Sequence, residues 1–229
     1  MNWSYRIGWR SFRILFSVYF RWRVLHPDRV PLTGPVILAC NHASYIDPPL
    51  VGAGVPRQIN YLARDTLFHI PVLASVLRSW GVVPVDRDGG SGRGLKAILD
   101  RLRDGGAIIL FPEGTRTWTG QLQPARSGIG LTVIKSDAPV VPARVFGTFE
   151  AYGKRLRWPR PRRLIVKYGN PLDFAALRAE ARTCSKPRLK EIYQQIADQI
   201  MSAIAQLQPA DDTRPAVRQP ALPAGRNQI

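Results

Sequence analysis

Acidic residues are scarce in this sequence. It contains 16 aspartates and glutamates against 33 lysines and arginines in 229 residues, which gives a formal net charge of +17. An excess of this size indicates an anionic partner. Nucleic acid, a phosphate-bearing ligand and an anionic membrane surface are the three classes that fit.

Cysteine, histidine and long apolar runs are scarce as well. Cys40 and Cys184 are too few for a disulfide scaffold and suit a reducing compartment. Three scattered histidines give no metal-ligand spacing, so we expect no metal site. No apolar run reaches the roughly 18–20 residues that span a bilayer, and arginines interrupt the N-terminal region where a signal peptide would be apolar. We therefore expect a cytosolic protein that lies on a membrane.

The positive charge is concentrated in two segments. Residues 1–29 carry six arginines against Asp28, and residues 144–167 carry eight arginines or lysines against Glu150. The second segment could be a nucleic-acid surface, a solvated face, or a contact for anionic lipid headgroups or an acidic protein. We favour the contact with lipid headgroups or an acidic protein, because basic residues are attracted to anionic surfaces such as membranes.

Residues 1–28 are predicted to form an amphipathic helix that associates with a membrane. One helical stripe is basic or polar, and aromatic and aliphatic residues occupy most of the remaining surface. Two interpretations stay open, namely burial of the apolar side in lipid and packing of that side on the protein's own core. The stripe consists of Arg6, Arg10, Arg13, Ser17 and Arg21.

The remainder of the chain is predicted to be one α/β domain over residues 29–208, followed by a disordered tail over 209–229. Short apolar runs alternate with helical patterns, which favours a mostly parallel central sheet flanked by helices. The predicted strands are Val36–Cys40, Ile59–Ala63, Gly81–Val85, Ala107–Phe111, Val140–Phe146 and Leu164–Tyr168. The predicted helices are Leu67–Ser79, Gly94–Arg103, Ile129–Ser136 and Pro187–Leu207.

A histidine and an aspartate follow the first of these strands at an unusual spacing. His42 and Asp47 are five residues apart, so a regular helix would point them about 140° away from each other. A loop could bring them together, with Asp47 as the N-cap of a helix that begins at Pro48-Pro49. Asn41 and His42 lie just past the carboxyl end of a predicted strand, where open α/β sheets bind ligands.

Three further strand ends add to this signal. "FPEGTR" at 111–116 supplies a glycine for close backbone approach and an arginine suited to phosphate, and "GVVPVDR" at 81–87 ends in a second arginine. In "VVPA" at 140–143, Pro142 predicts a strand near the sheet edge or with a bulge. Each segment alone is a weak signal, but the four together, in this order, are a strong one.

These segments resemble the four motifs of the 1-acyl-sn-glycerol-3-phosphate (lysophosphatidate) acyltransferase family of glycerolipid acyltransferases. The resemblance covers roughly residues 30–170 and implies that His42 is the general base and Asp47 its partner. It also implies an acyl donor, either acyl-CoA or acyl-carrier protein, and no cofactor. Its implied location is the cytoplasmic face of the inner (plasma) membrane. The substrate-binding residues it implies are Asn41, Arg87, Glu113, Gly114, Thr115, Arg116 and Arg126.

The resemblance implies transfer of a fatty acyl group to the sn-2 hydroxyl of 1-acylglycerol 3-phosphate, which gives phosphatidic acid. The residues are consistent with this chemistry, because an imidazole can take the hydroxyl proton and a carboxylate can orient it. Alternatives are a different lysolipid acceptor such as a lyso-ornithine lipid, a hydrolase, and a non-catalytic basic membrane or nucleic-acid binder. We expect Cys40 to be a buried strand residue and no nucleophile.

Overall fold

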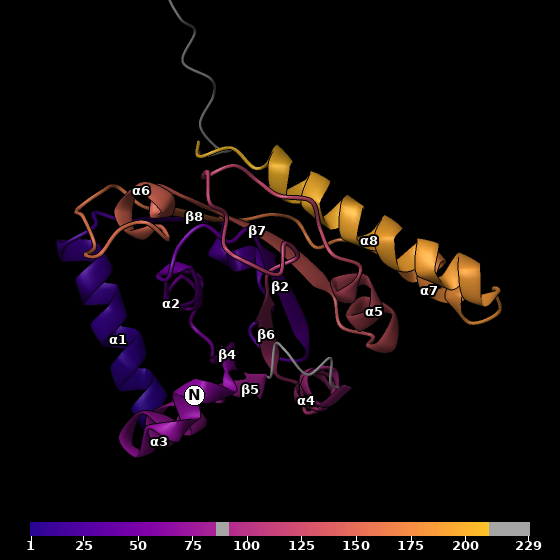
Figure 1. Ribbon diagram of the computed structural model, residues 1–229, viewed down its shortest axis with the longest axis horizontal. Coiled ribbons are helices and arrows are strands. Elements are labelled where there is room, and N and C mark those ends of the chain that lie inside the picture. Colours follow the sequence, from indigo (N-terminus) through magenta and orange to yellow (C-terminus); the bar gives the residue numbers. More distant parts are fainter. Residues whose placement is uncertain (86–91, 211–229) are drawn as a thin grey trace, which may run out of the picture.

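Residues 1–85 and 92–210 are described by a computed structural model (Figure 1). Its centre is a six-stranded sheet in the order β1-β8-β7-β2-β6-β3, in which only the β7–β8 pair is antiparallel. The mostly parallel α/β sheet expected from the sequence is therefore confirmed. These strands are β1 (Arg23–Leu25), β2 (Val36–Cys40), β3 (Ile59–Asn60), β6 (Ala107–Leu110), β7 (Val140–Phe146) and β8 (Ile165–Tyr168).

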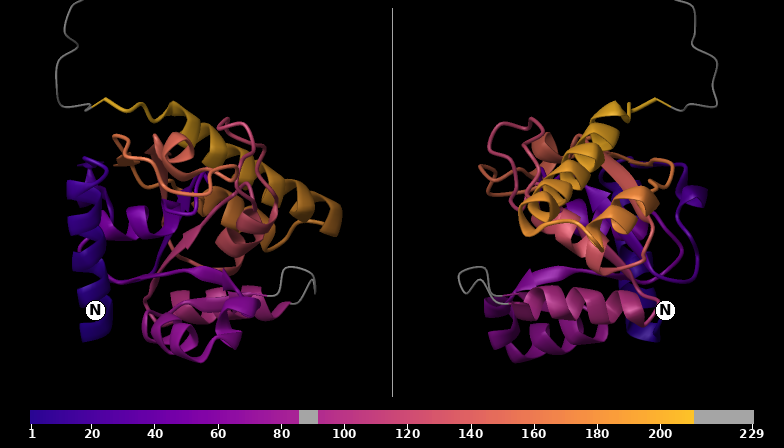
Figure 2. Two further views of the ribbon diagram at one scale, coloured as in Figure 1. Left: turned by 60° about the vertical axis from the view of Figure 1, so that its left-hand side comes forward. Right: turned by 90° about the vertical axis from the view of Figure 1, so that its right-hand side faces the viewer.

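Helices cover both faces of the sheet, which explains why its strands are apolar without alternation. In β2, Leu38 and Cys40 belong to one buried cluster, whereas Ile37 and Ala39 belong to the other. Figure 2 shows α1 standing against one side of the molecule and α8 lying along the other. The α-helices are α1 (Trp3–Val18), α2 (Asp47–Ala53), α3 (Pro71–Ser79), α4 (Gly92–Arg103), α5 (Gly128–Lys135), α6 (Thr148–Tyr152), α7 (Ala175–Ala181) and α8 (Lys186–Gln206), and the 3-10 helices are η1 (Pro27–Arg29) and η2 (Asp65–His69).

Most predicted elements are present, but two of them are divided. The predicted strand Ile59–Ala63 is divided between β3 and β4 (Leu62–Arg64), and β4 pairs with β5 (Val83–Val85) in a separate two-stranded sheet. The predicted helix Leu67–Ser79 is likewise divided into η2 and α3, because Pro71 cannot continue a helix but is favoured in its first turn. Residues 211–229 of the predicted tail lie outside the described residues.

Pro142 marks neither a sheet edge nor a bulge, because the register of β7 with β2 runs without interruption from Val140 to Ala143, so that prediction is wrong. β7 pairs with β2 on one side and with β8 on the other. Pairing with β8 begins only at Ala143, and the Pro142 carbonyl accepts a hydrogen bond from Gly169 N–H at 2.7 Å. The proline therefore lies at the end of the antiparallel ladder, where its missing N–H removes little pairing.

The N-terminal helix is shorter than predicted. It ends at Val18 instead of residue 28, and β1 then joins the central sheet beside β8. One side of α1 packs on the core, with Tyr5 and Phe16 buried. The opposite side exposes apolar residues at helical spacing, so the helix has two apolar sides. The exposed residues are Trp3 (76% exposed), Ile7 (57%), Ile14 (65%) and Val18 (77%).

Candidate active site

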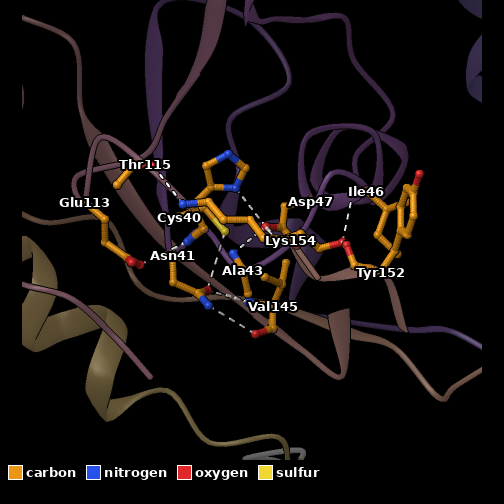
Figure 3. A network of polar contacts seen from close by, with 12 residues as sticks. Cys40, Asn41, Ala43, Ile46, Asp47, Glu113, Thr115, Val145, Tyr152 and Lys154 are labelled. Atoms are coloured by element: carbon orange, nitrogen blue, oxygen red, sulfur yellow. Dashed lines mark hydrogen bonds and ion pairs between the residues drawn. The ribbon is translucent and has the colours of Figure 1, made fainter. Parts of the chain in front are cut away.

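The site is built at the carboxyl end of β2, between its neighbours β6 and β7. Asn41 follows β2 and bridges to β7: its amide oxygen accepts from Val145 N–H at 2.9 Å and its amide nitrogen donates to the Val145 carbonyl at 3.4 Å. Figure 3 shows both contacts. Asn41 is only 7% exposed, so both polar ends of its side chain hold the strand end that presents His42. Its predicted substrate contact stays a prediction.

The loop after His42 brings the histidine and aspartate together, as the spacing suggested. His42 Nδ1 lies 2.8 Å from Asp47 Oδ2, and the imidazole stacks on Phe111 with ring centroids 3.8 Å apart. No described residue bonds Nε2, the second ring nitrogen. The imidazole is thereby fixed with one nitrogen on a carboxylate and the other available.

Asp47 does not cap α2 with its side chain, which corrects the sequence-based expectation. The N-cap position is Ile46, and no side-chain bond caps this helix. Asp47 Oδ2 turns back into the loop and accepts the N–H groups of Ala43 at 2.7 Å and Ser44 at 2.6 Å. The fully buried carboxylate thus collects three donors, and it shapes the loop as well as orienting the imidazole.

Glu113, at the end of β6, holds the histidine from its backbone side. Its Oε1 accepts His42 N–H at 3.0 Å, and its Oε2 accepts Gln123 Nε2 at 3.1 Å. Burial raises the pKa of the Glu113 carboxyl, although these two hydrogen bonds partly oppose that effect. Each carboxylate oxygen of Glu113 accepts a hydrogen bond from another residue, and Glu113 is only 3% exposed, so its contacts are those of a positioning residue. Its predicted role in substrate binding stays a prediction.

The "EGTR" segment places cations around His42. Gly114 has φ +71° and a Cβ there would lie 2.8 Å from the Arg126 side chain, so this position requires glycine. Thr115 Oγ1 accepts from Lys154 Nζ at 3.4 Å. The Arg116 guanidinium stacks over Tyr45 at 3.4 Å, and its Nη1 is buried without a hydrogen-bond partner among the described residues. A buried, unsatisfied guanidinium nitrogen is a ready donor to an anion.

Two cavities adjoin His42, and Pro48, Leu62 and Arg64 also line both of them. The first, of about 390 Å³, runs between α1, α2 and α3, and its wall is mostly aromatic and aliphatic, with Arg116 at the histidine end. The second, of about 330 Å³, lies toward the start of α5 and includes Gly114 and Arg126. His42 therefore lines two mostly apolar cavities, each of which also includes two arginines. The apolar wall includes Tyr5, Trp9, Phe12, Tyr61, Leu77 and Trp80.

Comparison with known proteins decides the family. The family model described as "Acyltransferase" matches residues 21–145, more than half of the chain. The chain belongs to the acyltransferase family. The match contains His42, Asp47 and the whole "EGTR" segment.

Named relatives of this acyltransferase share one printed function. The 1-acyl-sn-glycerol-3-phosphate acyltransferase of Bacillus subtilis is 28% identical over 197 residues, which cover 82% of this chain and 96% of the relative. A chloroplastic protein of that name from Brassica napus is 31% identical, but the match covers 50% of this chain and only 33% of the relative. A solved structure, the 1-acyl-sn-glycerophosphate acyltransferase from Thermotoga maritima, has a TM-score of 0.65 at 23% identity. That match covers 90% of this chain and 79% of the other, and at this identity it supports the fold.

The structure of the acyltransferase also adds residues that sequence reasoning missed. Arg64 follows β4 and lines both cavities beside His42, and Lys154 reaches the site from the loop after α6. Arg64 could have been found only from its position at the end of a predicted strand. Nothing in the sequence separates Lys154 from the other basic residues of the segment 144–167. Arg87, a predicted binding residue, lies outside the described residues.

Two negative expectations concern nucleophiles and metals. Cys40 is fully buried, and burial raises the pKa of its thiol well above its usual value, so the expected buried strand cysteine is what the structure shows. Within residues 1–85 and 92–210, no three His, Cys, Asp or Glu side chains gather as a metal site would require. In the same part of the chain, no helix is long and apolar enough to cross a bilayer.

Proposed function

We propose that the enzyme transfers a fatty acyl group from a thioester donor, acyl-CoA or acyl-carrier protein, to the sn-2 hydroxyl of 1-acylglycerol 3-phosphate. The product is phosphatidic acid, a precursor for phospholipid synthesis. The observation that carries this proposal is the His42–Asp47 pair beside two mostly apolar cavities that also hold arginines. The printed names of the relatives support the same acceptor.

His42 supplies the proton chemistry that this reaction needs. As the acceptor oxygen attacks the thioester carbonyl carbon, Nε2 takes the hydroxyl proton, and the imidazolium then returns it to the departing thiolate sulfur. The C–O bond forms, the C–S bond breaks, and no cofactor is consumed. Asp47 accepts Nδ1–H, which fixes the tautomer and stabilises the imidazolium, and a positioned base of this kind contributes on the order of 10²–10⁴ in rate.

The two cavities suit the acyl chain and the phosphate of the substrates. The apolar cavity has the size and lining for a fatty acyl chain, because lipid pockets are apolar with a few polar groups at one end. Arg116, with its buried unsatisfied nitrogen, lies at the histidine end of that cavity, and Arg64 and Arg126 line the second one. These guanidinium groups suit the acceptor phosphate, whose fixed charge would hold the sn-2 hydroxyl near Nε2.

We infer further that the enzyme works while bound peripherally to the cytoplasmic face of the membrane. Its substrate and product are membrane lipids, and the exposed apolar side of α1 is oriented away from the core. α3, which contacts α1, exposes Val72 (79%) and Val76 (38%) as well. A helix that docks with one side and exposes aromatic and aliphatic groups on the other suits the lipid interface.

Thiol release from several acyl-CoA donors in mixed micelles, with and without lysophosphatidate, tests the reaction. We expect release that requires both lysophosphatidate and His42, so His42→Ala removes it while the protein stays folded. His69→Ala is the matched control, since His69 is exposed on η2. Donor-dependent release without an acceptor would indicate a hydrolase. Silence with acyl-CoA, with acyl-carrier protein and with a panel of other lysolipids would refute the proposal.

A further inference from the structure

The two basic segments, 1–29 and 144–167, meet in space. β1 pairs with β8, with Arg23 opposite Ile165, and the Tyr19 hydroxyl donates to the Pro159 carbonyl at 3.0 Å. A surface cavity is lined entirely by residues of these two segments. Its lining is Val18, Tyr19, Arg21, Arg23, Pro161, Arg162 and Arg163, and we refer to it as the arginine cavity.

No described carboxylate neutralises the arginine cavity. None of its four arginines forms a salt bridge within residues 1–85 and 92–210, and Asp28 and Glu150 are the only acids in the two segments. The surrounding loop adds exposed Arg155, Arg157 and Arg160. Guanidinium groups gathered without counter-charges repel one another and favour an anion that accepts several N–H donors, as a phosphate does.

Exposed apolar groups border this charge. Val18 lines the cavity and is 77% exposed, it continues the exposed apolar side of α1, and Trp158 in the opposite loop is 72% exposed. A nucleic-acid surface or an acidic protein would account for the arginines but leave an aliphatic helix side in water. A bilayer accounts for both, because phosphates lie at the depth of the arginines and acyl chains lie below them.

We propose that the arginine cavity is a binding site for the phosphate headgroups of anionic phospholipids, separate from the catalytic site. It makes membrane association selective for anionic bilayers and fixes how the C-terminal end of α1 sits on them. This inference rests on the proposed peripheral association and names the lipid class that drives it. It does not depend on which lysolipid is acylated.

The experiment measures binding of the full chain to vesicles of phosphatidylcholine alone and of phosphatidylcholine with phosphatidylglycerol. The variant replaces Arg21, Arg23, Arg162 and Arg163 by glutamine. The control removes the same four charges elsewhere, at exposed Arg101, Arg182, Lys186 and Lys190 on α4, α8 and the end of α7.

We expect the cavity variant to bind anionic vesicles on the order of 10²–10³-fold more weakly than wild type, because each basic residue at an anionic surface contributes about fivefold. The control should lose far less, since charges more than about 10 Å from the membrane are screened. Both variants should keep wild-type turnover in neutral detergent micelles, which separates failure of this site from failure of the proposed reaction.

Four results would overturn the proposal. The first is equal loss of vesicle binding in the two variants, which would indicate net charge alone. The second is unchanged binding to anionic vesicles in the cavity variant. The third is a raised KM for acyl-carrier protein or acyl-CoA in micelles, which would assign the cavity to the acyl donor. The fourth is full competition of inorganic phosphate with vesicles, which would indicate a free-anion site.

Discussion

Replacing Asp47 tests the central geometry most directly, because its side chain has two separable tasks. Oδ2 accepts the imidazole Nδ1–H and also the backbone N–H groups of Ala43 and Ser44. The first contact concerns catalysis, and the other two hold the loop. His42→Ala removes the first contact only, so comparing variants at the two positions separates the two tasks.

The stability costs should differ in a predictable order. Asp47→Ala leaves two backbone donors, at Ala43 (5% exposed) and Ser44 (fully buried), without an acceptor. Each stranded donor costs about 1–3 kcal/mol, so the free energy of unfolding should fall by about 2–6 kcal/mol. Asp47→Asn keeps an oxygen acceptor but loses the charge, for a cost of about 2–4 kcal/mol over the three bonds. His42→Ala strands neither backbone donor and should cost least.

The effects of the Asp47 and His42 replacements on turnover should not be additive. Asp47→Asn cannot stabilise the imidazolium, and in a serine protease the equivalent replacement lowers kcat on the order of 10⁴-fold. If Asp47 acts only through the imidazole, the double variant His42→Ala/Asp47→Asn should be no slower than His42→Ala alone. Thiol-release turnover in micelles, measured on variants whose folding is checked by urea titration, provides both quantities.

Two outcomes would refute this reasoning. Turnover by Asp47→Asn within about tenfold of wild type would show that the carboxylate charge is not needed by the base. A double variant that is much slower than His42→Ala would show that Asp47 acts on the reaction by another route, for example through the loop. Asp28→Asn is a suitable control, because Asp28 is an exposed aspartate on η1 away from the site.

Two further predictions concern the neighbours of the pair. Arg116→Ala should raise the KM for lysophosphatidate at least tenfold with little change in kcat, whereas the exposed control Arg101→Ala should change neither. Steady-state kinetics at varied lysophosphatidate concentration measure both quantities. An unchanged KM would contradict the assignment of Arg116 to the phosphate. Burial raises the pKa of the Glu113 carboxyl, so the folded chain binds the carboxyl proton more tightly than the unfolded chain does. The resulting stabilisation of the folded chain is present at low pH and is lost as the pH rises through the folded-state pKa. The stability of Glu113→Gln relative to wild type should therefore increase with pH over that range in urea titrations, and a pH-independent difference would contradict the direction of the shift.

Four strands of the central sheet, β2, β6, β7 and β8, could be predicted from sequence because they are buried on both faces. β1 was not predicted, because its residues lay within the predicted N-terminal helix. Val36–Cys40 and Val140–Phe146 have the bounds that their apolar runs indicated, and the others differ by few residues. The division of Ile59–Ala63 could not be predicted. Local pattern does not specify that residues 59–60 pair with β6 while 62–64 pair with β5.

The contact between His42 and Asp47 could also be predicted, but not how Asp47 makes it. An aspartate before two prolines is a good N-cap by local rules, and only the three converging donors show that its carboxylate is turned toward the loop. The role of Glu113 was equally hidden. A carboxylate in a charged motif suggests substrate contact, whereas its bonds to His42 N–H and Gln123 require knowing that β6 lies beside β2.

The N-terminal helix packs one apolar side on the core and exposes another, so lipid contact of the exposed side stays a prediction. Its apolar residues had been assigned either to lipid or to the core, yet Tyr5 and Phe16 face the core while Ile7 and Ile14 face outward. The same helix forms one wall of the apolar cavity beside His42. If its outer side lies in the headgroup layer, its inner side borders the cavity that we assign to the acyl chain. A lipid could then reach the base by moving around α1 without its chain crossing water, which would otherwise cost about 0.8 kcal/mol for each exposed methylene.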